Sequence, residues 1–328
     1  MQSRRIGIQE VGSIGLGCMN LSHAYGTPPS REAAAELLRH ALDSGVVHFD
    51  TAALYGATAN ETLVGEVLGS RRDEFFLASK CGMTSVDGKR VIDGRPETLK
   101  ATCEDALRRL RTDHIDLYYL HRWDQDIPIE DSVGALAELV EEGKIGGIGL
   151  SEVSAATLQR AHAVHPIAAL QTEYSLWSRN PELGTLAACA ELGTAFVAFS
   201  PLGRGFLTGK IRDVDALPEA DIRRAMPRFS AANYPRNLEL LNQFAGLAGE
   251  AGCTPAQLAI AWLLHQGEHV IALPGTTSVP HLDEDLAADV VVVNAEVLKR
   301  ADALINEQTV HGARYSPAMQ ADVDTEEF

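Results

Sequence analysis

The stretch His48-Phe49-Asp50-Thr51-Ala52-Ala53-Leu54-Tyr55-Gly56 decides how the chain is organised. It follows Gly45-Val46-Val47, a short apolar run with β-branched residues that is typical of a buried strand. The strand leads directly to a carboxylate, Asp50, and the next loop carries a phenol, Tyr55, before a glycine that lets the chain turn. These two groups indicate half of a proton-transfer site, which still needs a cation and an orienting donor.

Outward from this stretch, segments with helical periodicity alternate with short apolar runs. Ser30 is a good helix N-cap, and Gly45 is a good helix stop. The expected strands are 13–19, 45–50, 75–80, 115–121, 145–151, 168–171, 196–200 and 269–273. The expected helices are 31–44, 60–69, 96–111, 130–142, 154–163, 181–192, 237–250, 255–266, 280–288 and 295–306.

Eight strands that alternate with helices predict a closed α/β barrel of the (β/α)8 TIM type. We expect a single domain over residues 1–328, with a long loop at about 203–236 after the seventh strand. A doubly wound open sheet is the competing fold, but Gly15-x-Gly17 lacks the third glycine of a dinucleotide-binding loop. The polar residues 307–328 are expected to form a mobile tail.

Composition restricts the class of partner. The chain has 45% hydrophobic and 22% charged residues, as a globular protein does, and its formal net charge is -17. This charge argues against nucleic-acid and anionic-membrane partners, and no apolar run is long enough to span a bilayer. The five scattered cysteines predict neither disulfides nor a metal site, and they fit a cytoplasmic protein. No signal for an oligomeric state is present.

The carboxyl ends of all strands meet on one face of such a barrel. Asp50 and Tyr55 follow the second strand, Lys80 ends the third and His121 ends the fourth. Each group alone has an ordinary structural explanation, such as a turn cap, a packed loop aromatic or a solvated cation. Their joint placement on one face favours an active site.

These residues resemble a known family. The runs Phe49-Asp50-Thr51-Ala52-x-x-Tyr55-Gly56, Ser79-Lys80 and Leu120-His121 are similar to the Asp-Tyr-Lys-His tetrad of the aldo-keto reductases. Gly149-Leu150-Ser151 and Pro274-Gly275-Thr276 add to the resemblance, which extends from about Gly15 to Leu286. The run from Phe199 to Lys210 is similar to the branch that holds bacterial and plant soluble aldehyde reductases.

The resemblance implies NAD(P)H-dependent reduction of a small carbonyl substrate. Tyr55 would protonate the carbonyl oxygen, although a free tyrosine titrates near about 10. Lys80 would lower the pKa of this phenol, Asp50 would hold Lys80, and His121 would orient the carbonyl. Two alternatives remain open at this point: a Schiff-base lyase or aldolase with Lys80 as the nucleophile, and a non-catalytic regulatory subunit on the same scaffold.

The resemblance also implies three groups of cofactor contacts. The nicotinamide would meet Ser151, Gln171 and Phe199. The pyrophosphate would be held by Ser200, Pro201, Leu202, Gly203, Arg204 and Lys210. The adenosine 2′-phosphate and adenine would be met by Gly275, Thr276, Thr277, Ser278, His281 and Asp285. NADPH is the expected cofactor, with NADH as the alternative.

Three residues depart from the family pattern. Glu152 replaces an asparagine after Ser151 and is expected to bring a negative charge near the nicotinamide ring. Asp285 replaces an asparagine that usually contacts adenine, and His281 stands where arginine or lysine is common. The apolar walls of the substrate pocket are expected from Met19, Tyr25, Trp123 and Trp177.

Overall fold

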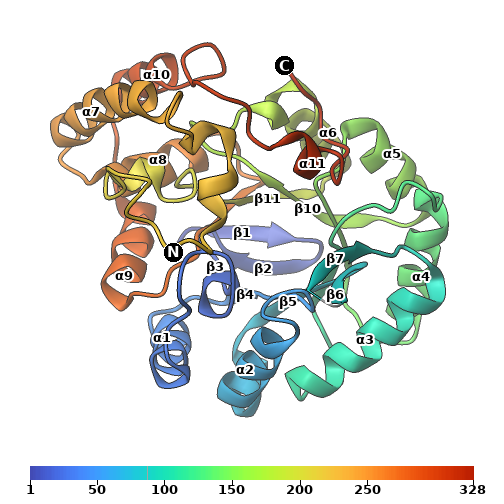
Figure 1. Cartoon of the computed structure of the whole chain (residues 1–328). Coiled ribbons are helices and arrows are strands. Elements are labelled where there is room, and N and C mark those ends of the chain that lie inside the picture. Colours follow the sequence, from blue (N-terminus) through green and yellow to red (C-terminus); the bar gives the residue numbers. More distant parts are fainter. Residues whose placement is uncertain (87) are drawn as a thin grey trace.

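Eight parallel strands hydrogen-bond in the order β12-β11-β10-β9-β8-β5-β4-β3 in the computed structural model, which describes residues 1–86 and 88–328. A parallel bridge between Ile14 and Ala272 joins the two outer strands, and the amide of Gly15 donates to the carbonyl of Ala272 at 2.9 Å. The sheet is therefore a closed barrel, and the predicted (β/α)8 fold is confirmed. Figure 1 shows the helices arranged around these strands.

The barrel strands are short, and helices separate them as the sequence predicts. The strands are β3 (Leu16–Gly17), β4 (His48–Asp50), β5 (Phe76–Cys81), β8 (Leu117–Leu120), β9 (Ile148–Ser151), β10 (Ile167–Glu173), β11 (Ala195–Phe199) and β12 (Val270–Leu273). The helices are α1 (Arg31–Asp43), α2 (Ala59–Leu68), α3 (Pro96–Leu110), α4 (Ile129–Glu141), α5 (Ala155–Val164), α6 (Thr185–Leu192), α7 (Tyr234–Glu250), α8 (Pro255–Leu264), α9 (Val279–Ala287), α10 (Ala295–Leu304) and α11 (Pro317–Gln320).

Local signals explain where helices begin. The Ser30 hydroxyl accepts a hydrogen bond from the amide of Ala33 at 3.2 Å, so Ser30 is the N-cap of α1 as predicted. Thr254 and Gln257 form a reciprocal capping box at the start of α8. Such caps satisfy amide donors that a helix cannot bond internally, and they fix the point at which each crossover leaves its strand.

Two hydrophobic layers hold the barrel together. The larger layer lies between the strands and the surrounding helices, and Leu38, Phe49 and Leu136 are fully buried in it. The smaller layer fills the barrel interior and includes Ile6 and Val11. These two residues belong to an antiparallel hairpin, β1 (Ser3–Ile6) and β2 (Gln9–Gly12), which the sequence analysis did not predict.

A second hairpin, β6 (Met83–Val86) and β7 (Lys89–Ile92), follows β5 and was also not predicted. The long loop after the seventh barrel strand is confirmed between β11 and α7, and it contains the short 3-10 turns η4 (Phe206–Thr208), η5 (Ile222–Ala225) and η6 (Pro227–Phe229). No helix in the described part of the chain has both the length and the apolar character needed to cross a bilayer.

The C-terminal segment, expected to be a mobile tail, packs against the barrel in the structure (Figure 1). Asp324 pairs with Val153 in a parallel bridge, and the Asp324 carboxylate accepts hydrogen bonds from the amide and hydroxyl of Ser154. The carboxylate of Glu326 accepts from the amide of Ala155 at 2.8 Å. Two acids of the segment thus bond to the start of α5, where free amides favour negative charge.

Candidate active site

Three neighbouring strands of the barrel bring the predicted tetrad together. Asp50 is the last residue of β4, Lys80 lies near the end of β5, and His121 directly follows β8. Tyr55 lies in the turn between β4 and α2. Because β4, β5 and β8 are adjacent in the sheet, the four side chains meet at the carboxyl end of the barrel.

The ammonium group of Lys80 is the centre of this cluster. It forms an ion pair with Asp50, donates to the backbone carbonyl of Thr51 at 2.9 Å, and donates to the Tyr55 hydroxyl at 3.1 Å. The second oxygen of Asp50 accepts from the Gln171 side-chain amide at 2.8 Å. Lys80 is fully buried, so these contacts replace its lost hydration.

Burial and charge act in opposite directions on the two groups. Burial alone would lower the pKa of Lys80, but Asp50 and then Tyr55 raise it above its ordinary value. Burial raises the pKa of Tyr55, and the nearby Lys80 lowers it by a smaller amount. The sequence analysis expected a phenol pKa lowered by Lys80; the lysine acts in that direction, but burial outweighs it. Tyr55 therefore carries its proton at neutral pH.

His121 lies edge-on to Tyr55, with ring centroids 5.8 Å apart and an interplanar angle of 87°. Its pKa is well below the ordinary value, because of burial first and then the positive charges of Arg122, Lys80 and Arg90. Its Nδ1 atom is buried and makes no hydrogen bond with the described residues. A neutral imidazole therefore lies beside the phenol, and its Nε2 atom, which is not among the buried atoms and makes no hydrogen bond with a described residue, is the nitrogen that a ligand in the cavity can meet.

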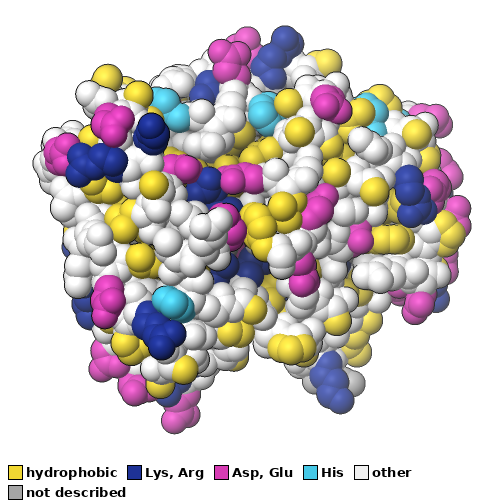
Figure 2. All heavy atoms as spheres, turned by 90° about the horizontal axis from the view of Figure 1, so that it is seen from above, with side chains coloured by type: hydrophobic (Ala, Val, Ile, Leu, Met, Phe, Trp, Pro, Cys, Tyr) yellow, Lys and Arg dark blue, Asp and Glu magenta, His cyan; other side chains and the backbone are white. Residues whose placement is uncertain are grey.

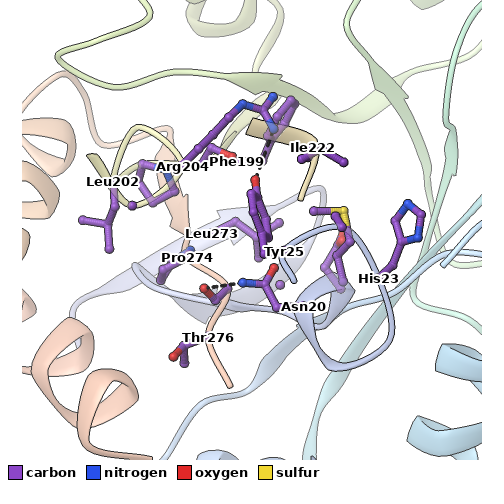
Figure 3. Close-up of a pocket in the computed structure, with 18 of the residues that line it drawn as sticks. Asn20, His23, Tyr25, Phe199, Leu202, Arg204, Ile222, Leu273, Pro274 and Thr276 are labelled. Carbon is purple, nitrogen blue, oxygen red and sulfur yellow. Dashed lines mark hydrogen bonds between the residues drawn. The ribbon is translucent and has the colours of Figure 1, made fainter. Parts of the chain in front are cut away.

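A cavity of about 540 Å³ opens over this cluster. Asp50, Tyr55 and His121 line it, and Lys80 lies behind them. Figure 3 shows a wall of this cavity, where Tyr25 lies between Arg204 and Asn20. The Arg204 guanidinium donates to the Tyr25 hydroxyl, and the Asn20 amide donates to the carbonyl of Gly275, both at 3.1 Å.

The predicted nicotinamide contacts all line this cavity: Ser151, Gln171 and Phe199. Of the predicted pyrophosphate contacts, Gly203 alone is not among the lining residues, since it packs on Trp177. Leu202 and Arg204 have backbone amides that make no hydrogen bond with described residues. Ser200, Gly203, Arg204 and Gly205 have positive φ angles, a backbone shape that can form an anion-binding concavity.

The side chain of Arg204 is engaged elsewhere. It pairs with Glu173 at 2.5 Å and donates to the hydroxyl of Tyr315. It also donates to the hydroxyl of Tyr25 (Figure 3). Arg204 thus links the first loop, the long loop and the C-terminal segment, where the sequence analysis expected a pyrophosphate contact. Lys210 lines the cavity, is exposed, and makes no ion pair with the described residues.

The last group of predicted contacts lies after β12. Gly275, Thr276, Thr277, His281 and Asp285 line the cavity. Ser278 does not line it; this residue is the N-cap of α9, and its amide donates to the Thr276 hydroxyl at 3.1 Å.

Glu152 does not line the cavity, which corrects the expectation of an added charge near the nicotinamide ring. The residue has a φ of +57° and its carboxylate is buried. It accepts from the amide of Glu173 at 2.8 Å and pairs with Arg314 of the C-terminal segment. The charge that sequence reasoning placed near the ring is therefore compensated by a guanidinium 162 residues away in the chain.

Two of the four residues predicted to form the apolar walls of the substrate pocket line the cavity. Met19 and Tyr25 line the cavity, but Trp123 and Trp177 do not. The Trp123 indole donates to the carbonyl of Ile127 at 2.8 Å, and Trp177 packs under the long loop against Phe206. Sequence reasoning missed other lining residues, among them Arg122, Tyr315 and Met319. Of these, Arg122 could have been found, because it directly follows His121.

The residues fit a nicotinamide dinucleotide. The backbone amides of residues 202, 204, 276 and 277 make no hydrogen bond with the described residues, and they provide two places for phosphate groups along the cavity. The ring of Phe199 offers an apolar face, and Ser151 and Gln171 offer polar groups that a carboxamide could meet. The tetrad lies beside these last residues, so a hydride donor held there would be close to Tyr55.

The closed (β/α)8 barrel and this site define the class of protein, an oxidoreductase of the barrel type. The chain belongs to the aldo/keto reductase family, whose sequence profile matches residues 13–306. Family membership makes it an enzyme that acts on small carbonyl compounds with a nicotinamide cofactor.

Individual relatives agree with this assignment. The chain is 43% identical over 319 residues to the probable aldo-keto reductase 1 of Glycine max, covering 96% of this chain and 92% of that protein. A glycerol dehydrogenase from Gluconobacter oxydans has a similar structure, with a TM-score of 0.85, 29% identity, and coverage of 96% and 98%. The holo form of an aldo-keto reductase from Bacillus halodurans has a TM-score of 0.78, 27% identity, and coverage of 95% and 98%.

Proposed function

We propose that this enzyme reduces an aldehyde or ketone to the alcohol with NADPH, and that Tyr55 is the general acid. The observation that carries the proposal is the 3.1 Å contact between the Tyr55 hydroxyl and the Lys80 ammonium at the edge of the cavity. A carbonyl that receives hydride develops negative charge on oxygen, and a positioned proton donor stabilises that charge.

Each residue of the tetrad has one task in this proposal. Tyr55 gives its proton to the carbonyl oxygen, and Lys80 stabilises the phenolate that remains. Asp50 keeps Lys80 charged and in place. His121, which is neutral, donates a hydrogen bond to the carbonyl oxygen and fixes its direction. The bound nicotinamide would supply the hydride.

The lyase alternative is less well supported. A Schiff base needs an unprotonated amine. The pKa of Lys80 is raised by Asp50 and Tyr55 against the effect of burial, and its ammonium already makes three contacts. We therefore expect no borohydride-trapped adduct on Lys80.

The proposed preference for NADPH is supported by residues after β12. The amides and hydroxyls of Thr276 and Thr277 lie at the cavity wall just before α9, a position that favours an anion. The imidazole of His281 lines the same wall and could donate a hydrogen bond to a phosphate there. A cytoplasmic location is also proposed, because all five cysteines are free thiols.

The substitution Tyr55→Phe tests the general-acid role. We expect turnover to fall by about 10²–10⁴-fold with little change in the dissociation constant of the cofactor, because the ring still packs. Tyr174→Phe is the matched control, since it removes a hydroxyl that bonds Glu182 outside the site. Turnover by Tyr55→Phe above about a tenth of the wild-type value, in a folded protein, would show that Tyr55 is not the acid.

A further inference from the structure

Arg122 is a cation at the active site that has no assigned contact with the carbonyl group in the proposed reduction. It follows His121, and its side chain is half-buried at the wall of the cavity. Its Nη1 atom donates to the carbonyl of His121 at 2.6 Å and to the hydroxyl of Ser151 at 3.1 Å. Its Nε atom is buried without a partner, and Nη2 makes no hydrogen bond with a described residue. Nη2 is therefore the donor of this guanidinium that remains for a ligand in the cavity.

Acids accompany most other basic side chains of the cavity. Within the described ranges, three of the five basic residues that line it form ion pairs, which are Arg90 with Asp322, Arg204 with Glu173, and Arg223 with Asp221. Lys210 and Arg122 form none there. Lys210 is exposed to water on the long loop, so Arg122 is the uncompensated cation beside the tetrad.

The charge of Arg122 acts on the reacting groups. After burial, Arg122 is the largest cause of the lowered pKa of His121, and it is one of the charges that favour the phenolate of Tyr55. On the face shown in Figure 2, acidic, basic and apolar side chains are interspersed. With a net charge of -17, attraction of an anion to this site must come from a local cation rather than from the protein as a whole.

We propose, on the basis of the proposed reduction, that the substrates are oxo acids: aldehydes or ketones that carry a carboxylate, which Arg122 binds. A half-buried guanidinium that has no acid partner among the described residues favours an anion, and a carboxylate is a strong acceptor for the N–H groups of its Nη2 atom. His121, Tyr55 and Arg122 line the same cavity, so a substrate whose carbonyl meets His121 and Tyr55 can place a nearby carboxylate at Nη2 of Arg122.

The test compares three substrates of equal chain length: 4-oxobutanoate, 4-oxobutanamide and butanal. We expect wild-type kcat/KM for the acid to exceed that for the amide by about tenfold or more, because hydrogen bonds to charged groups are the stronger ones. In Arg122→Met, kcat/KM for the acid should fall to nearly the same value as kcat/KM for the amide, mainly because KM for the acid rises. Arg122→Lys should restore part of the ratio.

Arg90→Met is the matched control, because Arg90 lines the same cavity but already has Asp322 as partner. This variant should keep the wild-type ratio of kcat/KM for the acid to kcat/KM for the amide. The inference is overturned if wild type shows no preference for the acid, if both substrates lose kcat/KM in parallel in Arg122→Met, or if a phosphate-bearing aldehyde of similar size is preferred. It is also overturned if Arg122→Met weakens cofactor binding and leaves the ratio unchanged.

Binding of succinate, which cannot be reduced, separates this inference from the proposed function. Calorimetry should detect succinate binding to wild type and a loss of at least about tenfold in affinity in Arg122→Met. Succinate binding that depends on Arg122 supports the carboxylate site even if no carbonyl compound is turned over. Turnover of aldehydes without succinate binding or acid preference overturns the carboxylate site and leaves the reductase function intact.

Discussion

Replacing Asp285 by asparagine should change how the stability of the protein depends on pH. Asp285 is on α9, 3% exposed, and its carboxyl group makes no hydrogen bond with the described residues. Burial, and then the charge of Glu284, raise its pKa to about 8. At neutral pH the folded protein therefore holds a proton on Asp285 that the unfolded chain has released.

The magnitude follows from this difference in proton binding. The folded pKa is raised above the ordinary value of 3.8, so the free energy of unfolding decreases as pH rises between these two values and levels off above pH 8. Each pH unit is worth about 1.4 kcal/mol, so stability should fall by at most about 4 kcal/mol from pH 5 to pH 8. Asparagine has a similar shape and no titrating proton, and it removes this contribution.

The assay is urea unfolding of wild type and Asp285→Asn at pH values from 5 to 9. The variant should gain stability over wild type steadily between pH 5 and pH 8, and the difference should then stay constant. Asp73→Asn is the matched control, because Asp73 is exposed and forms no ion pair with the described residues. It should follow the wild-type slope. A difference between Asp285→Asn and wild type that is the same at pH 5 and pH 8 would refute the reasoning.

Two further predictions concern the proposed reduction. Lys80→Met should raise the pKa of the catalytic phenol and reduce turnover, and because it leaves Asp50 buried without its counter-ion it should also destabilise the fold by about 3–5 kcal/mol. The double variant Asp50→Asn/Lys80→Met should recover stability but not turnover, as unfolding and steady-state kinetics would show; recovery of both would contradict the role given to Lys80. NADPH should bind more tightly than NADH, because Thr276 and Thr277 line the cavity just before α9, a position that favours the additional phosphate. Dissociation constants for both cofactors check this, and equal affinities would argue against the phosphate site after β12.

The barrel could be predicted from the sequence because its signals are local. Apolar runs, helix caps such as Ser30 and stops such as Gly45 set the alternation of strands and helices, and strict alternation leaves few topologies. The tetrad followed from the topology, since strand ends of a parallel barrel must meet. The hairpin at Ser3–Gly12 was missed because its strands are short and largely polar, and only the barrel interior gives Ile6 and Val11 a reason to be apolar.

The rest of the site depends on partners that are distant in the chain. An arginine such as Arg204 is a residue type that often binds phosphate. In this structure its guanidinium instead bonds to Glu173, Tyr25 and Tyr315, which come from three other segments of the chain. The effect of Glu152 likewise depends on Arg314. Trp123 lies outside the cavity because its indole bonds a nearby carbonyl, a contact that no periodicity in the sequence indicates.

The charges at the carboxyl end of the barrel divide into two kinds. Lys80 with Asp50, Arg204 with Glu173, and Arg314 with Glu152 are buried pairs in which each charge has its counter-ion within the protein. Such pairs add little net stability, but losing one partner is costly, so they fix the geometry around the cavity. Asp285 and Arg122 face the same cavity without a described counter-ion. A proton can neutralise the carboxyl group of Asp285, but no proton can be removed from a guanidinium near neutral pH. Among the described residues Arg122 has no acid partner, so in the proposed reduction the carboxylate of the substrate would supply its counter-ion.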